Sequence, residues 1–118
     1  MPDLTSIPAL LAFMRQQGNS DLPAIANTLE LWIDEEAEVL LELELHGTKG
    51  KRTSARVKSC RQDAEYHYLE EIKEFYSAPQ PLHQNAVFYY RRKPKAWAVA
   101  AALRTWSLNN ESPETSGT

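Results

Sequence analysis

Two long stretches of helical periodicity, separated by a short break, constrain this fold more than any other feature of the sequence. In the first, over residues 22–46, apolar side chains recur every three or four positions, as on one face of an α-helix. The second, over residues 54–76, repeats that spacing. Residues 47–52 combine two glycines with three bases, which is typical of an exposed loop. The sequence therefore predicts two long helices that return on each other as an antiparallel αα-hairpin.

The end of the first stretch has two interpretations. Residues 41–46 read Leu-Glu-Leu-Glu-Leu-His, which alternates with the period of a β-strand. Leu and Glu both favour helix, however, and no second strand is obvious for this one to pair with. We therefore favour helix, with a short strand as the alternative.

Shorter helices are predicted on both sides of the hairpin. Residues 7–17 form an amphipathic segment that Ser6 can cap and that Gly18 ends. On the C-terminal side, helices are predicted over residues 82–92 and, after Pro94, to about residue 108.

One domain is the expected unit, because 118 residues is the usual size of a chain with a single core. We predict an all-α domain over residues 1–108, a small helical bundle built on a long antiparallel αα-hairpin with shorter flanking helices. Residues 109–118 contain no apolar side chain and are predicted to form a disordered C-terminal tail.

The expected compartment is the cytoplasm. Cys60 is the single cysteine, so no intramolecular disulfide can form, and the N-terminal residues do not resemble a secretory leader. The longest apolar run covers residues 96–103, well short of the roughly 20 residues that a membrane-spanning helix needs. We therefore expect no contact with a membrane.

An enzymatic function is not expected, because no candidate group has a partner at a usable spacing. His46, His67 and His83 belong to no metal-binding pattern, and the acids beside His67 fit a solvated helix face. Cys60 falls on the apolar stripe of the second long helix, where it is expected to be a small core residue. We predict no catalytic residue, no metal and no cofactor.

The charges are sorted into blocks of one sign. Residues 30–44 carry seven acids and no base, and residues 49–61 carry six bases and no acid. Residues 63–74 are again acidic, and residues 91–104 carry only bases. In an antiparallel hairpin the first acidic block approaches the first basic block, where each exposed ion pair adds at most about 1 kcal/mol. Both blocks can be explained in this way without any ligand.

The basic blocks also predict a nucleic-acid interface. The first block joins bases and hydroxyls to the start of a helix, which suits phosphate, and the second has two tyrosines and Trp97 close to its bases. These aromatic residues can equally fill the core. The candidate nucleic-acid-binding residues are Lys49, Lys51, Arg52, Arg56, Lys58, Arg61, Arg91, Arg92, Lys93 and Lys95.

Two functions follow from these patterns. The first is a non-enzymatic helical subunit of a nucleoprotein assembly that contacts a DNA or RNA backbone non-specifically. In size, helix content and basic patches, the chain resembles the small helical subunits of CRISPR effector complexes, in architecture only. The alternative is a protein–protein interaction adaptor that uses its acidic helix and its aromatic C-terminal helices. The expected partners are nucleic acid and other protein subunits, and a homo-oligomer is an open alternative.

Overall fold

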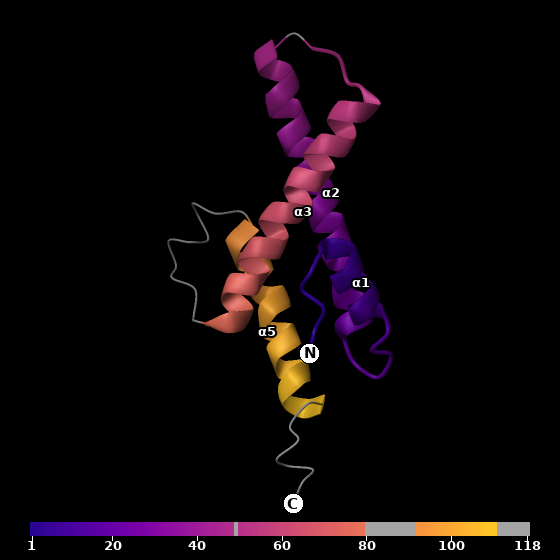
Figure 1. Ribbon diagram of the computed structural model, residues 1–118, viewed down its shortest axis with the longest axis vertical. Coiled ribbons are helices and arrows are strands. Elements are labelled where there is room, and N and C mark those ends of the chain that lie inside the picture. The colour runs from indigo at the N-terminus through magenta and orange to yellow at the C-terminus, as the bar shows by residue number, and fades with distance from the viewer. Residues whose placement is uncertain (49, 80–91, 111–118) are drawn as a thin grey trace, which may run out of the picture.

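The computed structural model describes residues 1–48, 50–79 and 92–110. This part of the chain contains four α-helices and no β-strand (Figure 1). The helices are α1 (Ile7–Arg15), α2 (Leu22–Thr48), α3 (Ser54–Ser77) and α5 (Arg92–Asn110). The predicted all-α class is confirmed, and residues 41–46 are helical, so the strand alternative is wrong. None of these helices is long and apolar enough to cross a membrane.

The predicted boundaries shift by a few residues at three places. Helix α1 ends at Arg15, where the predicted helix continued to residue 17, and the Gln17 side chain donates to the Phe13 carbonyl oxygen. Helix α5 begins at Arg92, two residues before Pro94, and extends to Asn110. The first two residues of the predicted tail are therefore helical. The predicted helix over residues 82–92, apart from Arg92, and tail residues 111–118 lie outside the described residues.

Side-chain caps explain where the helices begin. Ser6 Oγ accepts a hydrogen bond from the Ala9 amide at 3.1 Å, and Thr53 Oγ1 accepts one from the Arg56 amide at 3.1 Å. Ser20 Oγ accepts from the Leu22 amide at 3.2 Å at the start of α2. Each contact satisfies a backbone donor that the first turn of a helix leaves without a partner.

All four helices contribute to one core. Its fully buried side chains lie at helical spacing on each element, as the apolar stripes predicted. Burying each large aliphatic side chain contributes roughly 1.5–3 kcal/mol. The principal members are Ile7, Leu10 and Met14 of α1, Leu22, Ala26, Leu29 and Ile33 of α2, Ala64, Tyr68 and Ile72 of α3, and Ala96, Val99, Ala100 and Leu103 of α5.

The two long helices cross, and they diverge toward the connection that joins them (Figure 1). The predicted long antiparallel αα-hairpin is therefore not confirmed in detail. The shared core ends near Leu40 on α2 and Ala64 on α3. Beyond it, Leu41 and Cys60 are buried but do not belong to that core. We call residues 41–48 of α2 and 54–63 of α3 the arm.

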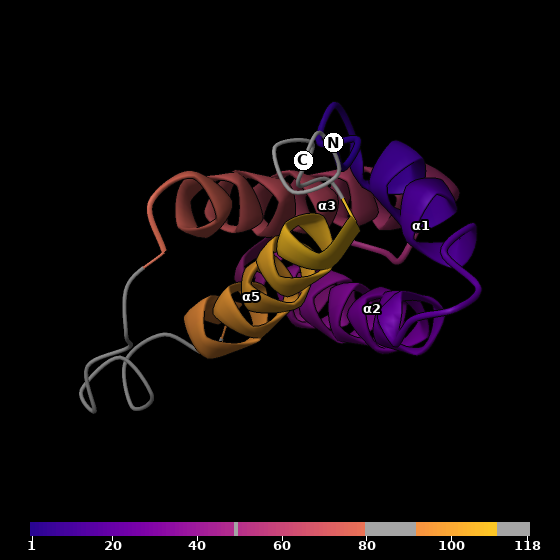
Figure 2. The same ribbon diagram turned by 90° about the horizontal axis from the view of Figure 1, so that it is seen from below.

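Helices α1 and α5 cover α2 and α3 only outside the arm. Helix α5 packs against both α2 and α3, as the second view also shows (Figure 2). Helix α1 packs mainly against α2. The α1–α2 connection and the C-terminal end of α5 lie together at the end of the molecule opposite the arm (Figure 1). These two ends carry the candidate surfaces described next.

Candidate interaction surfaces

The bases at the start of α3 are paired with acids of α2. Arg52 donates to both carboxylate oxygens of Glu38, at 2.8 and 3.3 Å. Arg56 lies 3.9 Å from Glu44, and its guanidinium also donates to the Lys51 carbonyl oxygen. The acidic block of α2 therefore faces the first basic block, as the sequence predicted.

Arg61 contacts three acids, more than Arg52 or Arg56 does. Its guanidinium pairs with Asp34 and, more distantly, with Glu30 of α2, and it donates to Glu65 of its own helix at 3.0 Å. Three carboxylates thus surround one base. The Arg61 side chain is 29% exposed, and its positive charge is already matched by these acids.

The Arg52–Glu38 pair shows how each charge stabilises the other. The hydrogen bond and the positive charge of Arg52 lower the pKa of Glu38, and the same hydrogen bond raises the pKa of Arg52. Both side chains are more than half exposed, so solvent weakens the pair. The main effect of this ion pair is that the two charges cancel much of each other's electrostatic potential at the surface.

Other predicted binding residues of the first block differ in their surroundings. Lys51 and Lys58 are exposed, and the structure records no ion pair for either of them within its described residues. Lys49 lies outside that part of the chain. The first block therefore offers two lysines whose charges are not matched by a neighbouring acid.

The second basic block holds a structural cluster. Arg92 lies between Glu36 of α2, at 2.8 Å, and Glu71 of α3, at 3.1 Å. The Glu36 and Glu71 side chains are 6% and 15% exposed, and that of Arg92 is 27% exposed. Burial opposes the charge on Arg92, but its hydrogen bonds and the attraction of both carboxylates raise its pKa. Arg92 therefore ties α5 to the two long helices.

The lysines that follow Arg92 also contact this chain. Lys93 lies 3.7 Å from Glu74 and above the Phe75 ring. Lys95 lies 3.8 Å from Glu35 and above the Trp32 ring, 5.6 Å from its centroid. Arg91, together with the two tyrosines before it, lies outside the described residues.

One sequence signal could have revealed the Arg92 cluster. Glu36 occupies the apolar stripe of α2, three residues after Ile33 and four before Leu40. A carboxylate at that position is buried when the helix packs, and a buried charge needs a partner of opposite sign. The pattern does not indicate which base supplies it, because Arg92 lies 56 residues away in the chain.

Cys60 is buried, with 3% of its surface exposed, in agreement with its predicted place on the apolar stripe. Burial, and then the hydrogen bond from its Sγ to Glu44 at 3.2 Å, raise the pKa of the thiol. Both effects disfavour the reactive thiolate. Within the described ranges, no three side chains of the metal-ligating types are grouped so that they could hold an ion.

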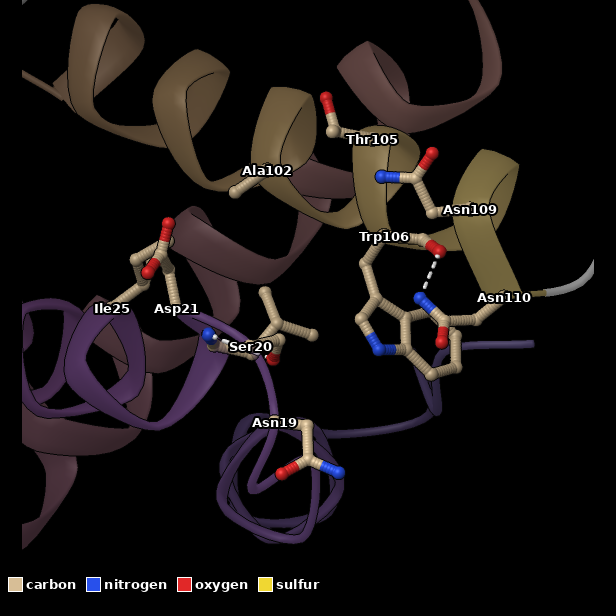
Figure 3. A pocket seen from close by; sticks show the side chains of 10 residues that line it. Asn19, Ser20, Asp21, Ile25, Ala102, Thr105, Trp106, Asn109 and Asn110 are labelled. Carbon is tan, nitrogen blue, oxygen red and sulfur yellow. Dashed lines mark hydrogen bonds between the residues drawn. The ribbon is translucent and has the colours of Figure 1, made fainter.

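A cavity that the sequence did not predict lies at the opposite end from the arm. It has a volume of about 660 Å³ and separates the α1–α2 connection from the last turns of α5 (Figure 3). Its lining is rich in amides and hydroxyls and includes one indole. The lining residues are Asn19, Ser20, Asp21, Leu22, Ile25, Ala102, Thr105, Trp106, Asn109 and Asn110.

These features define an all-α domain with a mixed-charge arm at one end and a polar cavity at the other. In comparisons with known proteins, no family model, curated protein or solved structure matched the chain. Functional inference therefore depends on the surfaces themselves.

Proposed function

We propose that this chain is a non-enzymatic interaction adaptor that binds another protein subunit through the arm. The observation that carries the proposal is the internal pairing of the charges in the arm and directly beside it. Arg52, Arg56 and Arg61 all contact acids of α2, which leaves a surface of mixed charge with apolar side chains on it. Protein interfaces combine an apolar centre with a polar rim of this kind.

The exposed apolar side chains supply the centre of the proposed interface. Leu43 is 66% exposed and Val57 is 37% exposed, one on each helix of the arm. Neither α1 nor α5 covers this end of the molecule (Figure 1). Burying Leu43 under a partner contributes roughly 1.5–3 kcal/mol, enough for the side chain to act as an anchor. Trp32, Trp97 and Trp106 are partly buried, which makes them poorer anchors.

The same pairing weakens the case for a nucleic-acid interface. Phosphate binding gains its free energy from cations whose charge is not already neutralised. Among the ten bases predicted to bind nucleic acid, Arg52, Arg56, Arg61, Arg92, Lys93 and Lys95 contact acids of this chain. Among the bases that the structure describes, a nucleoprotein role would depend chiefly on Lys51 and Lys58, and it is the competing result in the experiments below.

A photo-crosslinking amino acid at position 43 tests the adaptor function directly. The matched control position is Leu31, which lies on the same helix and is 62% exposed, but outside the arm. We expect one partner protein to crosslink in cells at position 43 and not at position 31. The partner is then purified, and its affinity for the Leu43→Glu and Leu31→Glu variants is measured by calorimetry.

Loss of at least about tenfold in affinity with Leu43→Glu, which corresponds to 1.4 kcal/mol, supports the adaptor. Leu31→Glu should bind like the unmodified protein. Equal affinity of the two variants, or crosslinking that does not depend on the position, contradicts the role of the arm. Circular dichroism confirms that both variants remain helical.

Titration of labelled single- and double-stranded oligonucleotides at two salt concentrations decides the competing function. The adaptor predicts no saturable change in anisotropy at low salt. Salt-sensitive binding that a Lys51→Ala/Lys58→Ala variant weakens would replace the adaptor with the nucleoprotein subunit. A Lys73→Ala variant is the control, because Lys73 lies on α3 outside the arm and pairs with Glu70.

A further inference from the structure

The cavity beside Trp106 has the size and position of a small-molecule site. Its volume of about 660 Å³ lies within the roughly 300–1,000 Å³ typical of ligand pockets. One wall is the α1–α2 connection with the first turn of α2, and the other is the last two turns of α5 (Figure 3). The arm lies at the other end of the molecule, so this site is separate from the proposed protein interface (Figure 1).

The lining carries almost no charge. Among the described residues that line it, Asp21 is the single ionisable one, and none is a lysine or an arginine. The C-terminal end of α5 adds the partial negative charge of the last helical carbonyl groups. Phosphates and carboxylates are therefore disfavoured, which excludes nucleotides and other anionic metabolites as the preferred ligands.

Several polar side chains in this cavity have hydrogen-bonding capacity to spare. Ser20 is already used, because it donates to the Gln17 carbonyl oxygen and accepts from the Leu22 amide. In the described part of the chain, no hydrogen bond is made by the side chains of Asn19, Asp21 or Asn109. Each amide offers two donors and an acceptor, and the carboxylate offers acceptors only.

The indole of Trp106 lies between these groups. In the close view, Asn109 lies on one side of it and Asn19 on the other, and its ring nitrogen faces the α1–α2 connection (Figure 3). Phe13 packs against Trp106 at nearly a right angle, with 5.2 Å between the ring centroids, which fixes the orientation of the indole. Ile25 and Ala102 add apolar surface to the lining.

We propose that this cavity binds a neutral sugar of one or two rings. Sugar hydroxyls both donate and accept hydrogen bonds, which matches the amides of Asn19 and Asn109 and the carboxylate of Asp21. The C–H faces of a sugar ring are apolar and fit against Trp106 and Ile25. A purely apolar ligand would use none of these donors and acceptors.

Binding is tested by ¹⁵N-correlation NMR of the full chain with three neutral probes, cellobiose, maltose and N,N′-diacetylchitobiose. We expect saturable shifts of the Trp106 indole N–H and of the Asn19 and Asn109 side-chain amides with at least one probe. A titration to about 20 mM suffices to detect a dissociation constant near 1 mM. Glucose 6-phosphate is the charged control, and it should bind more weakly than the neutral probe.

Two substitutions at exposed positions locate the site. Asn19→Ala and Asn109→Ala should each weaken binding about two- to tenfold, the range for one lost neutral hydrogen bond. Gln62→Ala, an exposed amide on α3, should have no effect. The absence of a saturable shift with all three probes overturns the proposal. So does unchanged affinity in a folded Asn19→Ala/Asn109→Ala variant.

Discussion

The Arg92→Met substitution is the sharpest test of how the bundle is held together. Arg92 is the first residue of α5 and contacts Glu36 of α2 and Glu71 of α3. Methionine keeps an unbranched apolar stem but removes the guanidinium. The variant therefore removes the cation that lies between two largely buried carboxylates.

The magnitude follows from the burial of the three groups. Removing one partner of a fully buried ion pair destabilises a protein by about 3–5 kcal/mol. Arg92 is 27% exposed, so water compensates part of the loss, and we expect a decrease of about 2–3 kcal/mol in the free energy of unfolding. For a domain of this size, that decrease lowers the melting temperature by about 10 °C.

Thermal and urea unfolding followed by circular dichroism measure the effect at pH 7. Adding Glu71→Gln to Arg92→Met should recover part of the stability at pH 7. Arg52→Met is the control, since Arg52 and its partner Glu38 are both exposed, and it should leave the melting temperature unchanged.

Two results would refute this reasoning. In the first, the Arg92→Met and Arg52→Met variants melt at the same temperature, which means that burial does not strengthen the Arg92 cluster. In the second, adding Glu71→Gln to Arg92→Met recovers no stability, which means that repulsion between the Glu36 and Glu71 carboxylates is not the cause of the loss. The effect would then reflect lost packing of the arginine stem.

Three further predictions concern buried side chains. Burial raises the pKa of Tyr68 well above its usual value. The free energy of unfolding should therefore be fully retained below pH 10 and decline as the pH rises past 10. Tyr68→Phe should abolish this decline in alkaline unfolding curves. Cys60 should react with a thiol reagent at least about tenfold more slowly in the folded than in the urea-unfolded protein, and equal rates would contradict its burial. Leu29→Ala should cost about 2–5 kcal/mol in urea unfolding, whereas Leu31→Ala at an exposed position should cost less than about 0.5 kcal/mol.

Local sequence signals predicted most of the helical structure. Apolar periodicity located the buried faces, and Ser6 is observed as the cap that the sequence predicted. Helix at residues 41–46 followed from the propensities of Leu and Glu, against a pattern that alternates like a strand. The end of α5 was less predictable. The Asn110 side chain donates to the Trp106 carbonyl oxygen there, in a stretch whose composition indicated a tail.

The candidate surfaces were harder to predict, because they depend on contacts between distant residues. The ten bases were assigned to a nucleic-acid interface from their order in the chain, which does not show their neighbours. The cavity at Trp106 joins residues 19–25 to residues 102–110, and no local motif marks that contact. Glu36 was the one informative exception, since its place on an apolar stripe required a buried partner.

The arrangement of charges explains why a block of one sign in a helical sequence is weak evidence for a charged ligand. When an acidic helix is followed by a basic one, the turn between them brings the two blocks face to face, and their fields largely cancel beyond a Debye length. Function is then expected where this cancellation is incomplete or where charge plays no part. In this chain those places are Leu43 and Val57 with the neighbouring Lys51 and Lys58, and the nearly uncharged cavity beside Trp106. A partner that recognised the paired arginines instead would have to break several ion pairs before it made its own contacts.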